Sequence, residues 1–257
     1  MSYVEFEGRR IAYEVQPESF DANDLAVVFI HGSGGDRNDW RFQLDGLSDT
    51  CTVIALELPG HGLSDQPGES DVSKYALRVE GFIEKLGLTK VVVVGCSLGS
   101  AITQTMALNP KPWLKAIGLV GAGARLRVMP SLLEALLSMP DKALDNLADY
   151  CLSDSASDQL RTAMKLKYTS SDPLLIHGDL SACDKFDVMK QLSLIKLPTI
   201  IIVGAQDKLT PVKYSKFLNE SIGASTMTVI DNAGHLVMLE QPEHFNMQIR
   251  RFLGQIS

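Results

Sequence analysis

A run of four valines that ends in Gly-x-Ser-x-Gly constrains this chain more than any other feature. Residues 91–94 are all valine, and Gly95-Cys96-Ser97-Leu98-Gly99 follows directly. A continuous β-branched run predicts a strand that is covered on both faces, as in a parallel sheet. Residues 98–108 have helical character, so Ser97 falls on an abrupt turn between a strand and a helix. The feature therefore predicts an α/β fold with a serine at the end of a buried strand.

The turn favours a chemical role for Ser97. Because glycine has no Cβ, Gly95 and Gly99 leave room for a tight, strained backbone that exposes the serine hydroxyl. An exposed hydroxyl there adds little to packing and suits nucleophilic attack. The neighbouring Cys96 is expected to face the core, since adjacent side chains of a strand point apart. A short pattern of this kind also occurs by chance, so the hypothesis needs partners elsewhere in the chain.

Composition narrows the class of protein. The chain has 257 residues, 45% of them hydrophobic and 21% charged, which allows one substantial core or one core with an insertion. The net charge of −7 argues against nucleic acid or an anionic membrane surface as the main partner. No apolar run approaches the roughly 18 residues of a membrane span. A small molecule is the expected partner, and the oligomeric state is left open.

The cysteines and the first residues of the chain indicate the cellular compartment of the protein. Cys51, Cys96, Cys151 and Cys183 are scattered and lack the spacing of metal ligands, so buried reduced thiols are the simplest interpretation. The first seven residues lack the basic and then apolar pattern of a signal peptide. We therefore expect a cytoplasmic protein without a bound metal.

Strand and helix signals alternate along most of the chain. An antiparallel hairpin is expected around Gly8-Arg9-Arg10, between residues 4–6 and 11–15. Alternation of strands and helices predicts a mostly parallel sheet with helices on both faces. The other predicted strands are 27–30, 52–56, 91–94, 116–120, 199–203 and 225–230. The predicted helices are 36–47, 74–86, 98–108, 211–220 and 242–253.

Residues 125–191 interrupt this alternation. No convincing strand appears there, and short helical segments are separated by Pro130, Pro140 and Pro173. The segment is either a helical layer of the main domain or an insertion. Because the alternation resumes afterwards, we expect an insertion. The expected division is a core of residues 1–123 and 192–257 and a helical cap of residues 124–191.

The serine needs two partners, and the chain offers both near strand ends. A serine hydroxyl is a weak nucleophile unless a base accepts its proton and a carboxylate orients that base. His235 follows the strand 225–230, and Asp207 follows the strand 199–203. Ligand sites form at the carboxyl ends of parallel strands, and the order Ser97, Asp207, His235 is the one expected for a triad there. In isolation, Asp207 is equally compatible with a turn or a helix N-cap.

Attack on a carbonyl also requires stabilisation of the resulting oxyanion. Backbone N–H groups are suitable donors, and that of Leu98 is one candidate. The second is expected from the loop His31-Gly32-Ser33-Gly34-Gly35, with Ser33 preferred and Gly34 as the alternative. This loop lacks the Gly-Lys-Ser/Thr ending and the Gly-x-Gly-x-x-Gly spacing of nucleotide-binding loops, so no cofactor is expected.

These motifs together resemble the α/β-hydrolase family, close to its esterase, lactonase and haloperoxidase-like members. The resemblance implies a mainly parallel eight-stranded sheet, a helical cap after the sixth strand, and structural roles for His31 and His61. The motifs span nearly the whole chain in family order. They are His31-Gly32-Ser33-Gly34-Gly35, Leu58-Pro59-Gly60-His61-Gly62-Leu63-Ser64, Gly95-Cys96-Ser97-Leu98-Gly99, Gly204-Ala205-Gln206-Asp207 and Asn232-Ala233-Gly234-His235.

The identity of the nucleophile narrows the chemistry. Relatives that open epoxides or cleave carbon–halogen bonds carry aspartate at the position of Ser97, so serine implies acyl transfer to water. The function expected first is hydrolysis of a carboxylic ester of a small, apolar substrate through an acyl-enzyme. The alternatives are a carbon–carbon bond hydrolase of aromatic ring-cleavage products, a thioesterase, an enol-lactonase, or a non-catalytic receptor of the same fold. Leu and Met residues at 129–139 suggest an apolar substrate pocket, or packing of the cap on the sheet.

Overall fold

The centre of the sheet is made from apolar runs in which charged side chains stand only near the strand starts. In the computed structural model, which describes residues 1–256, β4 (Thr52–Leu56) and β7 (Thr199–Gly204) are buried along their whole length. The valine run lies in β5 (Lys90–Cys96), where only Lys90 is exposed. Strands buried on both faces cannot alternate apolar and polar residues, because either face would then carry polar groups into the core. The predicted character of these strands is confirmed.

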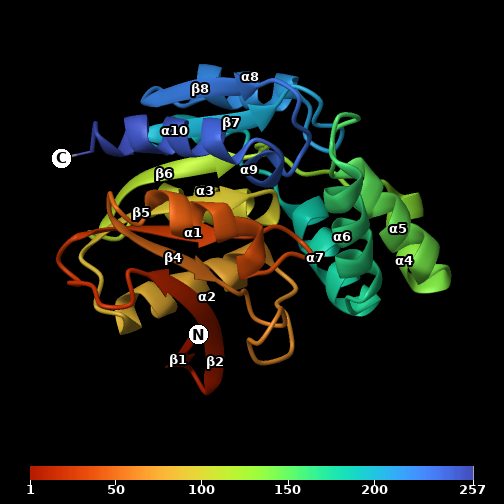
Figure 1. Cartoon of the computed structure of the whole chain (residues 1–257), viewed down its shortest axis with the longest axis horizontal. Helices are drawn as coiled ribbons and strands as arrows, with labels where there is room; N and C mark the ends of the chain where they lie inside the picture. The colour runs from red at the N-terminus through yellow and green to blue at the C-terminus, as the bar shows by residue number, and fades with distance from the viewer. Residues whose placement is uncertain (257) are drawn as a thin grey trace.

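Within residues 1–256, eight strands form one sheet with helices on both faces (Figure 1). Their order is β1-β2-β4-β3-β5-β6-β7-β8. β1 pairs antiparallel with β2, and β2 with β4, while the other neighbours are parallel. The predicted α/β class and the mostly parallel eight-stranded sheet are therefore confirmed. The remaining strands are β1 (Ser2–Phe6), β2 (Arg9–Gln16), β3 (Leu25–Ile30), β6 (Leu114–Val120) and β8 (Ser225–Ile230).

Two helical layers cover the sheet. One apolar cluster joins it to α2 (Val72–Lys85), α3 (Leu98–Leu108) and α8 (Val212–Ser221). The cluster on the other face includes α1 (Arg41–Leu47) and α10 (Pro242–Leu253). The short elements are the 3-10 turns η1 (Arg37–Trp40) and η2 (Leu192–Leu194), and α9 (Val237–Glu240).

The helix predicted for residues 36–47 is divided in the structure. Asp36 caps the 3-10 turn η1 by accepting the N–H of Asn38, and α1 begins only at Arg41. The backbone of Trp40, with φ −110° and ψ 13°, lies outside the α-helical region and separates η1 from α1. The expectation of a single helix here is wrong, although the apolar side chains Trp40, Leu44 and Leu47 are buried.

Four helices, together called the four-helix segment (residues 130–185), stand at one end of the molecule between β6 and β7 (Figure 1). The prolines that punctuate this stretch are the first residues of α4, α5 and α7, where a missing N–H costs nothing. An isolated bridge joins Arg125 and Asp187, on either side of the segment. The helices are α4 (Pro130–Ser138), α5 (Pro140–Tyr150), α6 (Asp158–Thr169) and α7 (Pro173–Lys185).

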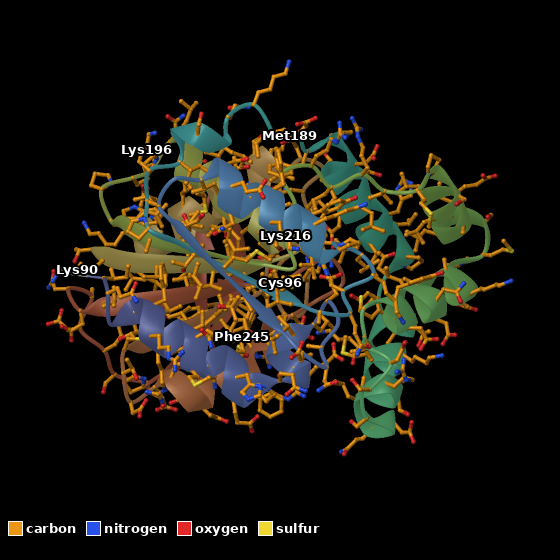
Figure 2. The ribbon with its side chains drawn as sticks, turned by 90° about the horizontal axis from the view of Figure 1, so that it is seen from above. Lys90, Cys96, Met189, Lys196, Lys216 and Phe245 are labelled. Atoms are coloured by element: carbon orange, nitrogen blue, oxygen red, sulfur yellow. The ribbon has the colours of Figure 1, made fainter. Side chains whose placement is uncertain are left out.

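The carboxyl ends of the parallel strands face the four-helix segment. Figure 2 shows Lys90, at the start of β5, on the side of the molecule away from that segment, and Cys96, at its end, near the centre. Loops that follow the strands therefore meet the helices, which is the arrangement that creates ligand sites in such sheets. Within residues 1–256, no helix combines the length and the hydrophobicity that crossing a membrane requires.

Candidate active site

The turn at Ser97 is strained and closely packed. Ser97 has φ 54° and ψ −115°, in a region that residues other than glycine rarely adopt. A Cβ at Gly95 would lie 2.0 Å from the carbonyl oxygen of Gly99, and one at Gly99 would lie 2.4 Å from that of Ile30. Only glycine fits at these two positions. The N–H of Ser97 donates to Val120 at 3.0 Å, which ties the turn to the neighbouring strand β6.

Asp207 and His235 form a buried pair at the same edge of the sheet. Nδ1 of His235 lies 2.8 Å from Oδ2 of Asp207. The other carboxylate oxygen of Asp207 accepts the N–H groups of Leu209 at 2.9 Å and Thr210 at 2.8 Å. The hydroxyl of Thr210 donates to Oδ2 at 2.8 Å. Asp207 is therefore both the turn residue that its sequence allowed and the partner of the histidine.

The environment keeps the Asp207 carboxyl ionised. Burial alone would raise its pKa, but the charge of His235 and the hydrogen bonds from His235 and Thr210 outweigh burial, so the pKa lies below its usual value. A carboxylate at Nδ1 favours the tautomer with hydrogen on that nitrogen and leaves Nε2 as an acceptor. Nε2 of His235 is buried and has no hydrogen-bond partner within residues 1–256.

Close contacts place His235 beside the serine turn. The thiol of Cys96, next to Ser97, contacts the carbonyl oxygen of His235 at 3.9 Å. A Cβ at Gly121 would lie 2.9 Å from the imidazole ring of His235. The structure brings Ser97, Asp207 and His235 to one edge, but it does not join Ser97 to Nε2 by a hydrogen bond. Such bonds are often long without substrate, so the triad stays a prediction.

Cys96 is not available as a competing nucleophile. Its side chain is fully buried, as expected, and burial raises the pKa of the thiol well above its ordinary value. The thiolate is the reactive form of cysteine, so Cys96 remains protonated and inert at neutral pH.

The glycine-rich loop lies directly against Ser97. A Cβ at Gly32 would be 3.1 Å from Cβ of Ser97. Leu98 is the first residue of α3, where N–H groups have no acceptor inside the helix. Within residues 1–256, neither this N–H nor that of Ser33 has a backbone acceptor. Two donors are thus free near the serine, while the choice of Ser33 over Gly34 stays a prediction.

His31 and His61 both make buried contacts with other parts of the chain. His31 donates from Nδ1 to the carbonyl of Gly32 at 2.7 Å and accepts the N–H of Leu58 at Nε2, 3.0 Å away. Burial lowers the pKa of His31 well below its usual value, so the ring is neutral. Nε2 of His61 lies 2.9 Å from Asp179 of α7, and the two histidine rings are 4.8 Å apart. Both rings are therefore engaged in contacts within the fold, which is typical of histidines with a structural role.

A cavity of about 230 Å³ opens above Ser97. Its apolar lining comes largely from the four-helix segment and the chain that leads into it, with Thr210, Tyr214, Arg127 and Lys208 adding polar groups. Within residues 1–256, no group of three or more His, Cys, Asp or Glu side chains is placed to hold a metal ion. The apolar residues are Leu126, Val128, Met129, Leu132, Leu147, Leu180 and Leu209.

Several residues around the site escaped the sequence analysis. Thr210 bonds to Asp207 and also lies 3.2 Å from Nδ1 of His235, and its position three residues after an Asp in a turn is a usable local signal. Tyr214 lines the cavity, and Asp179 contacts His61. Neither of these two has a local signal, because their partners lie far away in the chain.

Comparison with known proteins agrees with this geometry. Residues 26–242 match the sequence model of the alpha/beta hydrolase fold. A solved thermophilic esterase is 34% identical, and its structure superposes with a TM-score of 0.87 over 99% of this chain and 97% of that chain. The 3-oxoadipate enol-lactonase 2 of Acinetobacter baylyi is 25% identical, with 92% of this chain and 91% of that protein covered.

One relative is considerably longer. The dihydrolipoyllysine-residue acetyltransferase component of the acetoin cleaving system from Cupriavidus necator is 27% identical over 89% of this chain. The match covers 63% of that relative, so this chain spans less than two thirds of its length.

Proposed function

Because the chain belongs to the alpha/beta hydrolase family, we propose that it is a serine hydrolase that cleaves a carboxylic ester of a small, apolar substrate through an acyl-enzyme. One observation carries the proposal. The buried Asp207–His235 pair presents an unpartnered Nε2 at the sheet edge that also holds the strained turn of Ser97. A base without a partner at the same edge as a partly exposed serine is suited to proton transfer during acyl transfer.

The proposed mechanism has two steps. Oγ of Ser97 attacks the ester carbonyl while Nε2 of His235 accepts its proton and then gives it to the leaving alcohol. The N–H groups of Leu98 and Ser33 stabilise the oxyanion. His235 next takes a proton from water, which attacks the acyl-enzyme, and returns the proton to Ser97 as the acid leaves. Asp207 holds the imidazole in the productive tautomer and stabilises its charged form.

Residues 124–191 would act as a cap that selects the substrate. The four-helix segment and its connections supply most of the apolar lining above Ser97. An apolar cavity of about 150 Å³ holds a benzene molecule, with six carbon atoms. Scaled in proportion, a cavity of about 230 Å³ holds about nine non-hydrogen atoms. Esters with short acyl chains should therefore be preferred over long-chain lipids.

The test is hydrolysis of p-nitrophenyl butyrate by the wild type, Ser97→Ala and Cys96→Ala. Removing the nucleophile is expected to lower kcat by at least about 10⁴-fold, while the fold, followed by circular dichroism, is retained. Cys96→Ala tests the neighbouring thiol as an alternative nucleophile. Because it also removes the contact with the carbonyl of His235, it should lower kcat, but far less than Ser97→Ala. Undiminished turnover by Ser97→Ala would exclude Ser97 as the nucleophile.

Enol-lactone hydrolysis is the second candidate function. It is favoured by the likeness to the enol-lactonase of Acinetobacter baylyi, which extends over nearly the full length of both proteins. A lactone is a cyclic ester, so the same serine, base and oxyanion donors would serve. A panel of p-nitrophenyl esters, an enol-lactone, an acyl-coenzyme A and a vinylogous diketone separates the hydrolase classes. Tight binding without turnover across this panel would instead indicate a receptor.

A further inference from the structure

The loop that carries His235 is clamped between the sheet and the four-helix segment. The N–H groups of His235 and Leu236 both donate to the carbonyl of Cys151, at 2.9 and 3.2 Å. A Cβ at Gly234 would lie 2.6 Å from the backbone nitrogen of Ser153, and one at Gly204 would lie 2.2 Å from the carbonyl oxygen of Gly234. The backbone at Gly234 is therefore closely packed against both segments. Its position depends on the connection between α5 and α6.

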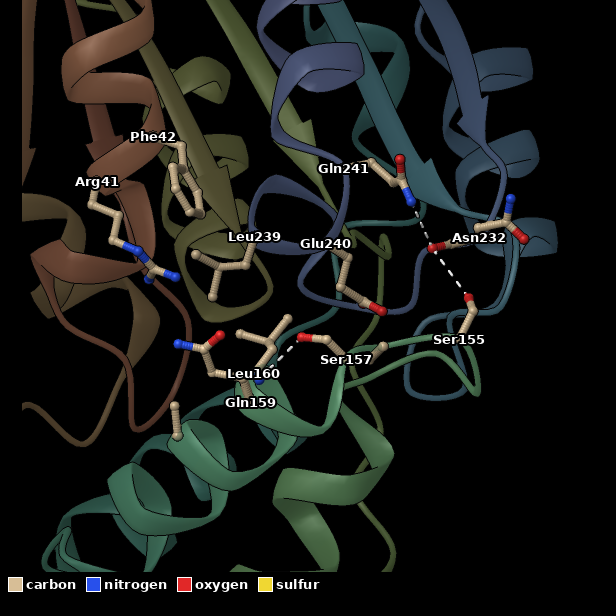
Figure 3. A pocket seen from close by; sticks show the side chains of 12 residues that line it. Arg41, Phe42, Ser155, Ser157, Gln159, Leu160, Asn232, Leu239, Glu240 and Gln241 are labelled. Atoms are coloured by element: carbon tan, nitrogen blue, oxygen red, sulfur yellow. Dashed lines mark hydrogen bonds between the residues drawn. The ribbon is translucent and has the colours of Figure 1, made fainter.

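A single carboxylate joins the two sides of this clamp. Glu240, the last residue of α9, is partly buried. One oxygen accepts the N–H of Gly234 at 2.7 Å, and the other accepts the N–H of Ser153 at 2.9 Å. Figure 3 shows its side chain pointing toward the connection that carries Ser155 and Ser157. Both oxygens of one carboxylate are thus used, and each accepts a backbone N–H from a different segment.

We propose that Glu240 is a positioning residue for His235. It holds the Ala233–Gly234 peptide, one peptide removed from the histidine, and fastens that peptide to the four-helix segment at Ser153. Through this link, docking of the segment sets the position of Nε2 relative to Ser97. The inference rests on the proposed function, because it assigns His235 the role of base. A misplacement of about 1 Å in such a group can lower the rate about 10²-fold.

The surroundings of Glu240 make the inference testable by substitution. The residue borders a cavity of about 450 Å³, drawn in Figure 3, whose lining also includes Arg41, Gln159 and Asn232. This cavity is distinct from the one above Ser97. Water can enter it and bond to the N–H groups that a shorter side chain at position 240 would leave unpaired. The fold should therefore tolerate the loss of the carboxylate.

The experiment compares wild type, Glu240→Ala, Glu240→Gln and the control Glu243→Gln, which changes an exposed carboxylate in α10. Activity on p-nitrophenyl butyrate is divided by the number of reactive serines, counted by titration with diethyl p-nitrophenyl phosphate. For Glu240→Ala we expect kcat per reactive serine to fall about 10- to 100-fold, with KM within about three-fold. For Glu240→Gln, kcat per reactive serine should fall less, because the amide oxygen still accepts one of the two N–H groups. Glu243→Gln should match the wild type.

A merely structural role gives a different result. It would reduce the number of reactive serines and leave kcat per reactive serine unchanged. If kcat per reactive serine of Glu240→Ala lies within two-fold of the wild-type value, the inference is overturned. If the alanine variant does not fold, the same comparison is made with Glu240→Gln. Failure of the proposed function is separate, since it would appear as a wild type without turnover or as an active Ser97→Ala.

Discussion

The turn at Ser97 and the loop at His235 are held in place by opposite means. Around Ser97, two glycines within two residues of it provide the space that the strained backbone needs. Around His235, the holding groups come from Asp207, Cys151 and Glu240. Two of these lie 28 and 84 residues away in the chain, by subtraction of the residue numbers. The nucleophile is a local feature, whereas the base belongs to the tertiary structure.

This difference teaches where substitutions can separate the two halves of the site. The serine turn should keep its conformation when the four-helix segment is perturbed, because its neighbours belong to β3, β5, β6 and α3. The base loop should respond to changes in a segment with which it shares hydrogen bonds to Cys151 and Ser153. Two predictions test this contrast, and a third tests a separate contact of the four-helix segment.

The largest expected effect is a loss of activity when Asp207, the partner of His235, is changed. Asp207→Asn preserves the shape of the side chain, but it removes the charge that favours the productive tautomer of His235. We expect kcat on p-nitrophenyl butyrate to fall by about 10⁴-fold, while the serine turn and the fold persist. Steady-state kinetics and thermal unfolding measure the two effects separately. A loss smaller than ten-fold would mean that Asp207 does not orient the base.

A smaller effect, on stability, should follow from breaking the serine turn. Gly99→Ala places a Cβ 2.4 Å from the backbone oxygen of Ile30, which cannot move without shifting β3. We expect the free energy of unfolding to fall by about 3 kcal/mol, the upper end for overpacking of a rigid site. Urea titration followed by circular dichroism measures it.

The matched control for this change is Gly178→Ala in α7. A Cβ at Gly178 would have no neighbour within 4 Å, and alanine is favoured over glycine in a helix. The control should therefore stabilise the protein by about 0.5–1 kcal/mol. Equal losses of stability in the two variants would show that close packing at the turn is not the cause.

The smallest expected effect concerns the contact between α7 and the loop after β4, which carries His61. Burial alone would lower the pKa of His61, but the charge of Asp179 and its hydrogen bond outweigh burial and raise the pKa above its usual value. A histidine with a raised pKa in the folded state stabilises the fold fully below its unfolded pKa of about 6.5, and this contribution is lost as the pH rises through the folded pKa. The contact between His61 and Asp179 therefore contributes least to stability at alkaline pH.

Asp179→Asn should therefore destabilise the protein more at pH 6 than at pH 9. We expect a loss of about 2 kcal/mol at pH 6, the usual scale for a hydrogen bond to a charged group, and a smaller one at pH 9. The asparagine oxygen still accepts the hydroxyl of Tyr75, which bonds to Asp179 at 2.7 Å in the wild type. Urea unfolding at both pH values measures the difference. A loss that grows with pH would contradict the assignment.

Much of the fold could be predicted because its signals are local. The predicted strands 52–56 and 225–230 and the predicted helices 98–108 and 242–253 have the bounds of β4, β8, α3 and α10. Apolar runs set the strands, and Pro242 marks the first turn of its helix. The single helix expected at 36–47 was wrong because the backbone of Trp40 leaves the α-helical region between η1 and α1.

The candidate site also contains residues that local signals predicted and residues that they did not. Ser97, Asp207 and His235 follow strands whose sequence is unambiguous, so their presence at one edge of the sheet was predictable. The roles of Glu240 and Asp179 were not, because each carboxylate contacts a segment whose distance along the chain leaves no repeating pattern. Glu240 contacts Ser153 and Asp179 contacts His61 only after the helices pack on the sheet.

The sequence by itself determined the strands, the glycine-flanked turn and the order of the serine, the acid and the base. These features depend on backbone sterics and on the burial of neighbouring side chains, which act within a few residues. Only the tertiary structure decided how the four-helix segment meets the loop of His235 and how large the cavity above Ser97 is. Hydrogen bonds between distant segments carry no local signature. The residues around an Asp or Glu in the sequence are the same whether or not a distant partner reaches its carboxylate.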